Sequence, residues 1–288
     1  MRMTQKFSNL TAVVCTLNSE NSLERCLVSL VKIVDFLIVV DGGSSDSTLA
    51  IADKYADLLL HDSGSGLGEA RGLGLARVKT DYILNSGADN ILSTKAVSKM
   101  LKILESTPIV YGVSCQTVVE EQGYLSKVSN RIWRTRFSSG YSQMVGTPNI
   151  FRTQQLRKFG YSKTRGWSDD EEVCIRMYRE EKALFEIIDD ECQEIGQATL
   201  RRQIYRYFHY GFSDFEIFSA RKQEWNLLRQ VNSILHPLKV EFLRPIMRLN
   251  ALDKFFCLPI MFSATLLRYS GWVYRLMVSG FRNDTRVN

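Results

Sequence analysis

The sequence has few histidines and no closely spaced cysteine pair. Three of its 288 residues are histidine, and the six cysteines, at positions 15, 26, 115, 174, 192 and 257, form no C-x-x-C motif. Zinc sites and disulfide frameworks both depend on regular cysteine or histidine spacing. Several of these cysteines lie in apolar runs, where a thiol packs as a small hydrophobic side chain. We therefore expect reduced thiols and no structural metal.

Long apolar segments are also lacking. Phe255–Leu267 is apolar for thirteen residues and contains Pro259, whereas a helix needs about 20 apolar residues to cross a bilayer. The first nine residues, MRMTQKFSN, lack the apolar centre of a signal peptide. We expect a cytoplasmic protein that does not cross the membrane unaided.

The chain does contain ample material for a packed core, because 45% of its residues are hydrophobic. Its formal net charge of +6 is unevenly placed. From Gln197 onward fourteen Lys and Arg oppose six Asp and Glu, a net charge of +8, so the first 196 residues carry about −2. We predict a catalytic domain at residues 1–195 and a basic, helical C-terminal extension at residues 196–288.

Two β-branched apolar runs near the N-terminus predict neighbouring strands. Leu10–Thr16 and Phe36–Val40 have no polar alternation, as is typical of parallel strands that are covered on both faces. Between them, apolar residues recur at i, i+3, i+4 and i+7 from Leu23, which predicts a helix. The three segments together form a βαβ unit of an α/β fold.

Polar residues stand where the predicted strands end, and ligands bind at this edge of open α/β sheets. The second strand runs into Asp41 and the glycines that follow it, and the strand Tyr82–Asn85 runs into Asp89. Four glycines within positions 64–72 precede or open a helix that carries Arg71, although they do not form the G-x-G-x-x-G dinucleotide motif. The same residues also suit ordinary surface turns, and Asp89 also suits a cap for the next helix.

Five stretches in this order resemble the family 2 glycosyltransferases, which have the GT-A fold. They are TLNSENSLERCLVSL, IVVDGGSSDST, GEARGLGLARVKTDYIL, SGADN and GWSDDEEVCIRM, and together they cover about Leu10 to Ile188. The resemblance implies a Rossmann-like mixed sheet flanked by helices, with a nucleotide-binding half followed by an acceptor-binding half. It also implies a nucleotide-sugar donor.

The resemblance also implies the residues of the donor pocket. Asp41 takes the nucleotide base, and Arg71 lies near the ribose or the diphosphate. The full set of residues implied for the nucleotide is Thr16, Asn18, Glu20, Asp41, Gly43, Arg71, Gly87 and Ala88.

SGADN aligns with the Asp-x-Asp metal motif of the family, but Gly87 replaces the first acid. Asp89 remains as the implied metal ligand, with the neutral oxygen donor Asn90 beside it. Mg²⁺ or Mn²⁺ is the implied cofactor, and Mg²⁺ often needs only one or two protein carboxylates because water and phosphate supply its other oxygens. The sequence also lacks the histidine that many relatives have soon after the last core strand, near Leu184–Ile188.

Four consecutive acids, at positions 169–172, exceed what a helix N-terminus needs for charge compensation. The resemblance maps the catalytic general base onto Asp170, with Asp169 as the next candidate. A sugar hydroxyl is a poor nucleophile until its proton is removed, so the reaction needs such a base. Attack opposite the leaving group inverts the anomeric carbon.

The basic C-terminal part suits two roles. Aromatic and basic residues follow the apolar stretch Phe255–Leu267, a pattern that suits the surface of an anionic membrane and hence a polyprenyl-phosphate or other lipid-linked acceptor. A helix packed on the catalytic core fits the same residues. Binding of single-stranded nucleic acid is disfavoured, because the acidic segments upstream repel phosphate.

The sequence thus predicts an inverting glycosyltransferase that uses a UDP- or GDP-sugar, placed in the cytoplasm or on the inner face of the membrane. Its acceptor is a glycan hydroxyl or a lipid-linked group. Two other functions stay open. A nucleotidyltransferase also uses an α/β sheet and acidic metal ligands, although TLNSEN lacks the basic Gly-rich loop expected after its first strand. A non-catalytic binding protein would keep the fold after losing the first metal acid.

Overall fold

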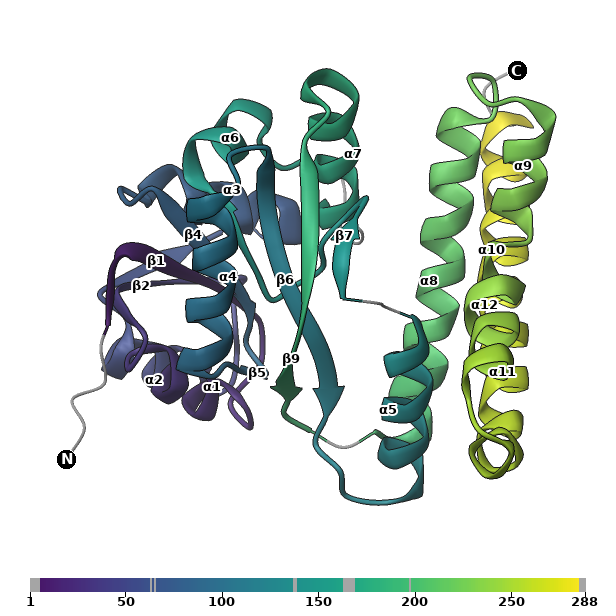
Figure 1. The fold of residues 1–288 in the computed structure, drawn as a ribbon, viewed down its shortest axis with the longest axis horizontal. Helices are drawn as coiled ribbons and strands as arrows, with labels where there is room; N and C mark the ends of the chain where they lie inside the picture. The colour runs from purple at the N-terminus through teal and green to yellow at the C-terminus, as the bar shows by residue number, and fades with distance from the viewer. Residues whose placement is uncertain are drawn as a thin grey trace. The chain divides into compact units, whose positions relative to one another are not determined.

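The computed structural model describes residues 6–62, 64, 66–136, 139–162, 169–196 and 198–284. The chain divides into two compact units (Figure 1). Unit 1 comprises Met1–Val118 and Ser138–Gly196, and unit 2 comprises Val119–Phe137 and Gln197–Asn288. The sequence predicted one boundary after residue 195, whereas the structure also assigns helix α5 (Tyr124–Arg136), from the middle of the chain, to unit 2.

Unit 1 is built on one sheet with the strand order β3-β2-β1-β4-β8-β6-β9-β5, and β7 pairs with β9. Strands β1 to β4 run parallel, and β8 runs antiparallel to both β4 and β6. This arrangement confirms the predicted mixed sheet flanked by helices. The strands are β1 (Phe7–Thr16), β2 (Val34–Asp41), β3 (Leu58–His61), β4 (Tyr82–Gly87), β5 (Asn90–Ile91), β6 (Val110–Val119), β7 (Gly140–Ser142), β8 (Asn149–Arg152) and β9 (Leu184–Glu194).

Both faces of the sheet are covered, which explains the apolar runs without polar alternation. Along β1, Ala12 and Val14 belong to one hydrophobic core and Val13 belongs to the other. Successive side chains of a strand point to opposite faces, so the central residues of β1 are buried whichever way they point. Helices α1 (Leu23–Leu30), α2 (Thr48–Tyr55) and α4 (Thr94–Ser106) cover the first face; α3 (Leu67–Arg77), α6 (Thr153–Phe159) and α7 (Asp169–Glu181) cover the second (Figure 1).

Unit 2 is helical. Its small hydrophobic core joins Val128 and Ile132 of α5 to Cys257, Ile260 and Met261 of the long C-terminal helix α12. None of the described helices combines the length and the apolar character that a membrane span needs. The other elements are α8 (Leu200–Arg221), α9 (Leu227–Ile234), α10 (His236–Leu238), the π-helical turn η1 (Lys239–Leu243), α11 (Arg244–Arg248) and α12 (Ala251–Asp284).

Helices α8 and α12 cross with their backbones in contact (Figure 1). A Cβ atom on Gly211 of α8 would lie 1.7 Å from the carbonyl oxygen of Arg268, and one on Gly271 of α12 would lie 1.9 Å from that of Phe208. Both obstacles are main-chain atoms, which cannot turn aside as a flexible side chain does. The two glycines therefore set how closely the helices approach.

Replacement of Gly271 by alanine is expected to destabilise unit 2 by about 1–3 kcal/mol, because the new methyl group forces the helices apart. This loss outweighs the better helix propensity of alanine. Urea unfolding followed by circular dichroism measures it. Gly72→Ala in α3 is the matched control, since a Cβ there meets nothing within 4 Å. Equal stability of the two variants would contradict the close crossing.

A buried charge cluster lies between the helices of unit 2. Glu241, in the π-helical turn, has no exposed surface. One of its carboxylate oxygens accepts a hydrogen bond from Arg136 of α5, and the other accepts one of 2.6 Å from Nη1 of Arg268 of α12. Arg268 also donates two bonds, of 2.6 and 2.9 Å, to Asp214 of α8. Four elements are thus joined through one chain of charges.

Candidate active site

The carboxyl ends of the parallel strands bring the predicted donor residues to one edge of the sheet. Register pairs Thr16 with Asp41 across β1 and β2, Asp41 with His61 across β2 and β3, and Cys15 with Gly87 across β1 and β4. The loops that follow these strands therefore begin side by side. This is the edge at which α/β sheets bind ligands.

The loop after β2 is shaped by Asp41. Oδ2 of Asp41 accepts hydrogen bonds of 2.9 Å from the backbone N–H groups of Gly43 and Ser44, and Oδ1 accepts one of 2.5 Å from the Ser44 hydroxyl. Gly43 has φ +89°, a conformation that glycine adopts without strain. Asp41 itself has no exposed surface. Because the carboxylate is buried, a direct contact with a nucleotide base would require the loop to move.

The loop after β1 is tied to the loop after β2. Oδ1 of Asn18 accepts a 2.9 Å bond from the N–H of Ser45, and the N–H of Asn18 donates a 2.8 Å bond to the Ser44 hydroxyl. Oε2 of Glu20 accepts a 3.1 Å bond from the N–H of Ser47. Asn18 and Glu20 are both exposed at this edge. The structure therefore places these two predicted residues together, where they join the two loops.

Two buried hydroxyl groups at the site have no hydrogen-bond partner among the described residues. One is the Thr16 hydroxyl at the end of β1, and the other is the phenol of Tyr161. Tyr161 packs its ring 5.6 Å from the guanidinium carbon of Arg71. Buried polar groups are usually paired, so both groups are candidates for contact with a bound molecule.

Arg71 joins helix α3 to the acids at the start of α7. Its Nη1 donates a 2.8 Å hydrogen bond to Oδ2 of Asp169 and another to Oδ1 of Asp170, and its Nη2 donates one of 2.5 Å to the hydroxyl of Thr147. The Thr147 hydroxyl in turn donates a 2.8 Å bond to Oδ2 of Asp170. Both carboxylate oxygens of Asp170 are therefore held. The preceding predicted motif residues, 166–168, lie outside the described residues.

The charges of this cluster act on the thiol of Cys15, near the end of β1. Burial raises the pKa of the Cys15 thiol to about 12, Arg71 lowers it, and Asp169 and Asp170 raise it further. Burial also raises the pKa of Asp169 to about 6, although the neighbouring Arg71 opposes that shift. Asp170 keeps 14% of its side chain exposed, against 4% for Asp169. Asp170 is thus the acid of the pair that a substrate reaches more easily.

The end of β4 carries the residues of the predicted metal motif. A Cβ atom on Gly87 would lie 2.9 Å from Oδ1 of Asp89 and 2.9 Å from Oδ1 of Asn90, so the glycine makes room for both side chains. Asn90 is buried, and its Oδ1 accepts a 2.9 Å bond from the Gly87 N–H. The neutral oxygen donor predicted beside Asp89 is therefore engaged within the turn.

The alternative role of Asp89 and Asn90 as a helix cap is not what the structure shows. Ser93 caps α4 by accepting a 3.1 Å bond from the N–H of Ala96. Within the part of the chain that the structure describes, no group of three or more His, Cys, Asp or Glu side chains is arranged to hold a metal ion. Asp89 thus offers a single carboxylate, with Ala88 beside it packed against the core.

Sequence reasoning missed Thr147 and Tyr161. Thr147 lies just before β8 and Tyr161 lies just after α6, and neither belongs to the five stretches that resemble the family. Both contact Arg71 from positions 76 and 90 residues further along the chain. Only the tertiary fold reveals such contacts.

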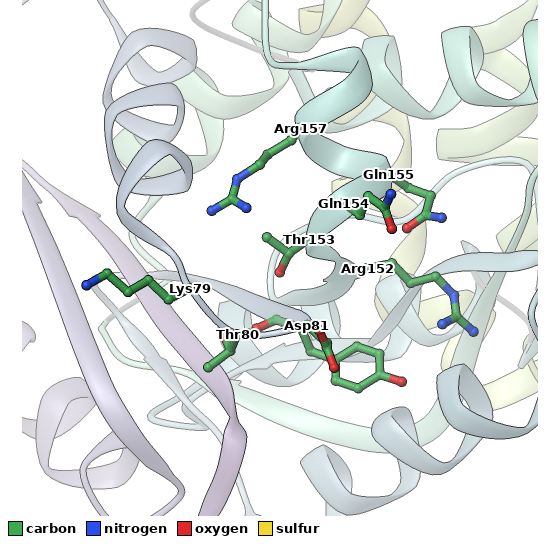
Figure 2. A pocket seen from close by; sticks show the side chains of 9 residues that line it. Lys79, Thr80, Asp81, Arg152, Thr153, Gln154, Gln155 and Arg157 are labelled. Carbon is green, nitrogen blue, oxygen red and sulfur yellow. Dashed lines mark hydrogen bonds between the residues drawn. The ribbon is translucent and has the colours of Figure 1, made fainter.

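A cavity of about 280 Å³ lies at the opposite edge of the sheet. It is lined by residues at the amino end of β4, beginning with Tyr82, and at the carboxyl end of the antiparallel β8, ending with Arg152 (Figure 2). The guanidinium groups of Arg152 and Arg157 are bonded to backbone carbonyls. This cavity is therefore separate from the predicted donor site.

A family model described as Glycosyl transferase family 2 matches residues 11–166, more than half of the 288 residues. The chain belongs to glycosyl transferase family 2. This confirms the resemblance that the five sequence stretches indicated, and the match includes the predicted donor residues from Thr16 to Asp89. Asp169 and Asp170 lie just beyond the matched range.

A curated relative of this family 2 protein is a TPR repeat-containing protein of Synechococcus elongatus. It is 30% identical over 165 residues, which are 50% of this chain and 40% of that protein. The family 2 chain therefore spans less than half of that relative.

Solved structures share the fold at low identity. A mannosyltransferase from Pyrobaculum calidifontis, in complex with GDP-Man and Mn²⁺, has a TM-score of 0.61 at 15% identity, covering 95% of this chain and 88% of that one. Glucosyl-3-phosphoglycerate synthase from Mycobacterium tuberculosis, in complex with Mn²⁺, UDP-Glc and phosphoglyceric acid, has a TM-score of 0.51 at 17% identity, covering 66% and 72%. Both comparisons support the GT-A fold of this family 2 protein.

Proposed function

We propose that the protein transfers a sugar from a UDP- or GDP-sugar to an acceptor with inversion at the anomeric carbon, and that Asp170 is the general base. The observation that carries the proposal is the cluster in which Arg71 and Thr147 hold both oxygens of Asp170. A base must be fixed in position to take a proton at the moment of attack. Family membership supports the reaction class.

In this reaction the acceptor hydroxyl gives its proton to Asp170 while its oxygen bonds to the anomeric carbon. The bond from that carbon to the diphosphate breaks, and the electron pair leaves on the phosphate oxygen. Arg71 and Thr147 are placed to hold the Asp170 carboxylate in position for this transfer. Asp169 lies on the same guanidinium and is the alternative base.

The donor is proposed to bind at the carboxyl edge of the sheet. The unpaired Thr16 hydroxyl and the joined loops that carry Asn18 and Glu20 support a nucleotide there. Because Asp41 is buried beneath its own loop, we propose that the base meets the loop that Asp41 shapes, including Gly43. Gly87 and Ala88 border the same edge at the end of β4.

A divalent cation, Mg²⁺ or Mn²⁺, is proposed to accompany the donor. Asp89 is the residue that would hold it, with the remaining oxygens from the diphosphate and water, which suits a hard cation bound through one carboxylate. When bound, such a cation stabilises the negative charge that develops on a departing diphosphate. Gly87 leaves room for the Asp89 carboxylate, because a Cβ atom at this position would lie 2.9 Å from Oδ1 of Asp89.

The acceptor is proposed to be lipid-linked, such as a polyprenyl-phosphate, with the protein working on the inner face of the membrane. In unit 2 a cavity of about 640 Å³ runs along α8 and combines Arg201 and Arg202 with Ile204, Tyr205 and Phe208. Basic groups beside apolar ones suit a phosphate attached to a hydrocarbon chain. A glycan hydroxyl is the other acceptor that the sequence left open.

The experiment that tests this function is a panel of UDP- and GDP-sugars, measured by thermal shift and by release of nucleoside diphosphate with MnCl₂. One donor class is expected to raise the melting temperature and to be hydrolysed slowly. Binding without hydrolysis would favour the non-catalytic alternative. Pyrophosphate release from a nucleoside triphosphate and a sugar phosphate would favour the nucleotidyltransferase. No response to any UDP- or GDP-sugar would contradict the proposal.

A further inference from the structure

Helix α12 is apolar on two opposite sides. One side is buried and carries Cys257, Met261 and Ala264. The other side is exposed, with Phe255 75%, Phe262 58%, Leu266 52%, Val273 41% and Met277 59% accessible. These exposed residues are spaced by seven, four, seven and four positions, which keeps them on one line along a helix. At about 1.5 Å per residue the line is roughly 33 Å long.

Helix α9 adds a second unpartnered apolar face. Its residues Leu227, Leu228, Val231 and Ile234 are all exposed, and no residue of the helix is buried. The hydroxyl of Tyr269 on α12 donates a 3.0 Å hydrogen bond to the carbonyl of Ile234, which holds the end of α9 against α12. Soluble monomers rarely expose so much contiguous apolar side-chain surface without a partner.

The charges on the same segment are basic. Between Lys222 and Leu266 there are six Lys and Arg (222, 229, 239, 244, 248 and 254) and three acids. Of the acids, Glu241 is wholly buried and Asp253 is paired with Arg131 at 2.8 Å. Unit 2 as a whole has eighteen Lys and Arg against eight Asp and Glu, a net charge of +10.

We propose that α9 and the exposed side of α12 form a docking surface for an anionic bilayer, with both helices lying in the plane of the interface. Amphipathic helices that insert apolar side chains among lipid headgroups, flanked by Lys and Arg, bind such membranes.

A second copy of the chain is a poorer occupant of this surface. A symmetric contact places the same surface on both copies, so the basic charges would face each other. This inference rests on the proposed function and deepens it, because a protein that uses a lipid-linked acceptor must work at a membrane surface.

Vesicle co-sedimentation of the full chain tests this surface. The wild type is expected to bind phosphatidylcholine vesicles that contain phosphatidylglycerol, to bind pure phosphatidylcholine weakly, and to lose affinity as NaCl increases. The triple variant Phe255→Gln, Phe262→Gln, Leu266→Gln is expected to bind anionic vesicles at least about tenfold more weakly, since three inserting side chains are removed. All three are exposed, so folding is expected to persist.

The matched control is Phe36→Gln, Leu73→Gln, Ile109→Gln, three exposed apolar residues of unit 1. It is expected to bind vesicles like the wild type. The proposed docking surface is wrong if both triple variants lose vesicle binding equally, or if the α12 variant loses none. If the wild type does not bind vesicles but forms a dimer in light scattering, and the α12 variant abolishes that dimer, the face binds a second copy of the chain instead.

Donor hydrolysis is measured on the same proteins. If the protein binds vesicles but does not hydrolyse donor, only the proposed function is contradicted. If it hydrolyses donor but does not bind vesicles, only the docking surface is contradicted.

Discussion

Asp170→Asn is expected to lower the rate of donor hydrolysis by about 10²–10⁴-fold, the contribution of a positioned general base. Asparagine keeps the shape of aspartate, and its Oδ1 can still accept the bond from Arg71, but its amide nitrogen can only donate on the side of Thr147 and cannot take a proton. Donor affinity is expected to stay near that of the wild type. Release of nucleoside diphosphate under single-turnover conditions measures the rate, and a donor titration by calorimetry measures the affinity.

Glu180→Gln is the matched control for this variant, because it makes the same chemical change on an exposed residue near the end of α7. It is expected to hydrolyse donor at the wild-type rate. If Asp170→Asn also did so, Asp170 would not be the base. If instead Asp169→Asn removed turnover and Asp170→Asn did not, the two neighbouring acids would have exchanged roles.

Glu241→Gln is expected to destabilise unit 2 by about 3–5 kcal/mol, the typical cost of leaving buried charges without their partner. The carboxylate serves two arginines at once, Arg136 and Arg268, whose side chains are 4% and 9% exposed. Without it, Asp214 is the one acid left in the cluster to balance both. Thermal unfolding followed by circular dichroism is expected to show a melting temperature lower by on the order of 10 °C.

Glu216→Gln gives the comparison at the surface. Glu216 pairs with Arg275 at 2.8 Å, but 41% of its side chain is exposed. Exposed ion pairs contribute little, so this change is expected to cost less than about 1 kcal/mol. A Glu241→Gln protein as stable as Glu216→Gln would show that the buried cluster does not hold the helices of unit 2 together.

The sheet and its helices were predictable because their apolar patterns are local. The runs at Leu10–Thr16 and Phe36–Val40 are largely buried on both faces, as their composition predicted, although Phe36 itself is exposed, and the helix from Leu23 follows its 3.6-residue period. The last strand was less predictable. The sequence ended it near Ile188, but β9 continues through a polar segment to Glu194, and its last two residues pair with β5 at the edge of the sheet.

The contacts of the site were predictable only in part. The family resemblance assigned Arg71 to the donor pocket and Asp170 to the general base, and the structure adds that the two side chains bond directly. Thr147 belongs to no motif, so only tertiary structure reveals it. In unit 2, Glu241 looks like any acid between apolar neighbours in the sequence. Its burial depends on helices that begin 117 residues before it and ten residues after it.

The bonding of Asp41 has a consequence for donor choice. Its carboxylate is buried beneath its own loop, so on the proposed function uracil and guanine would be distinguished by the contour of the main chain and by the hydroxyls of Ser44 and Ser45, not by a charge. Because Asn18, in the loop after β1, bonds to the loop after β2, a change in the loop after β1 also reshapes the loop after β2. Altered nucleotide preference would thus be sought through paired substitutions across the two loops.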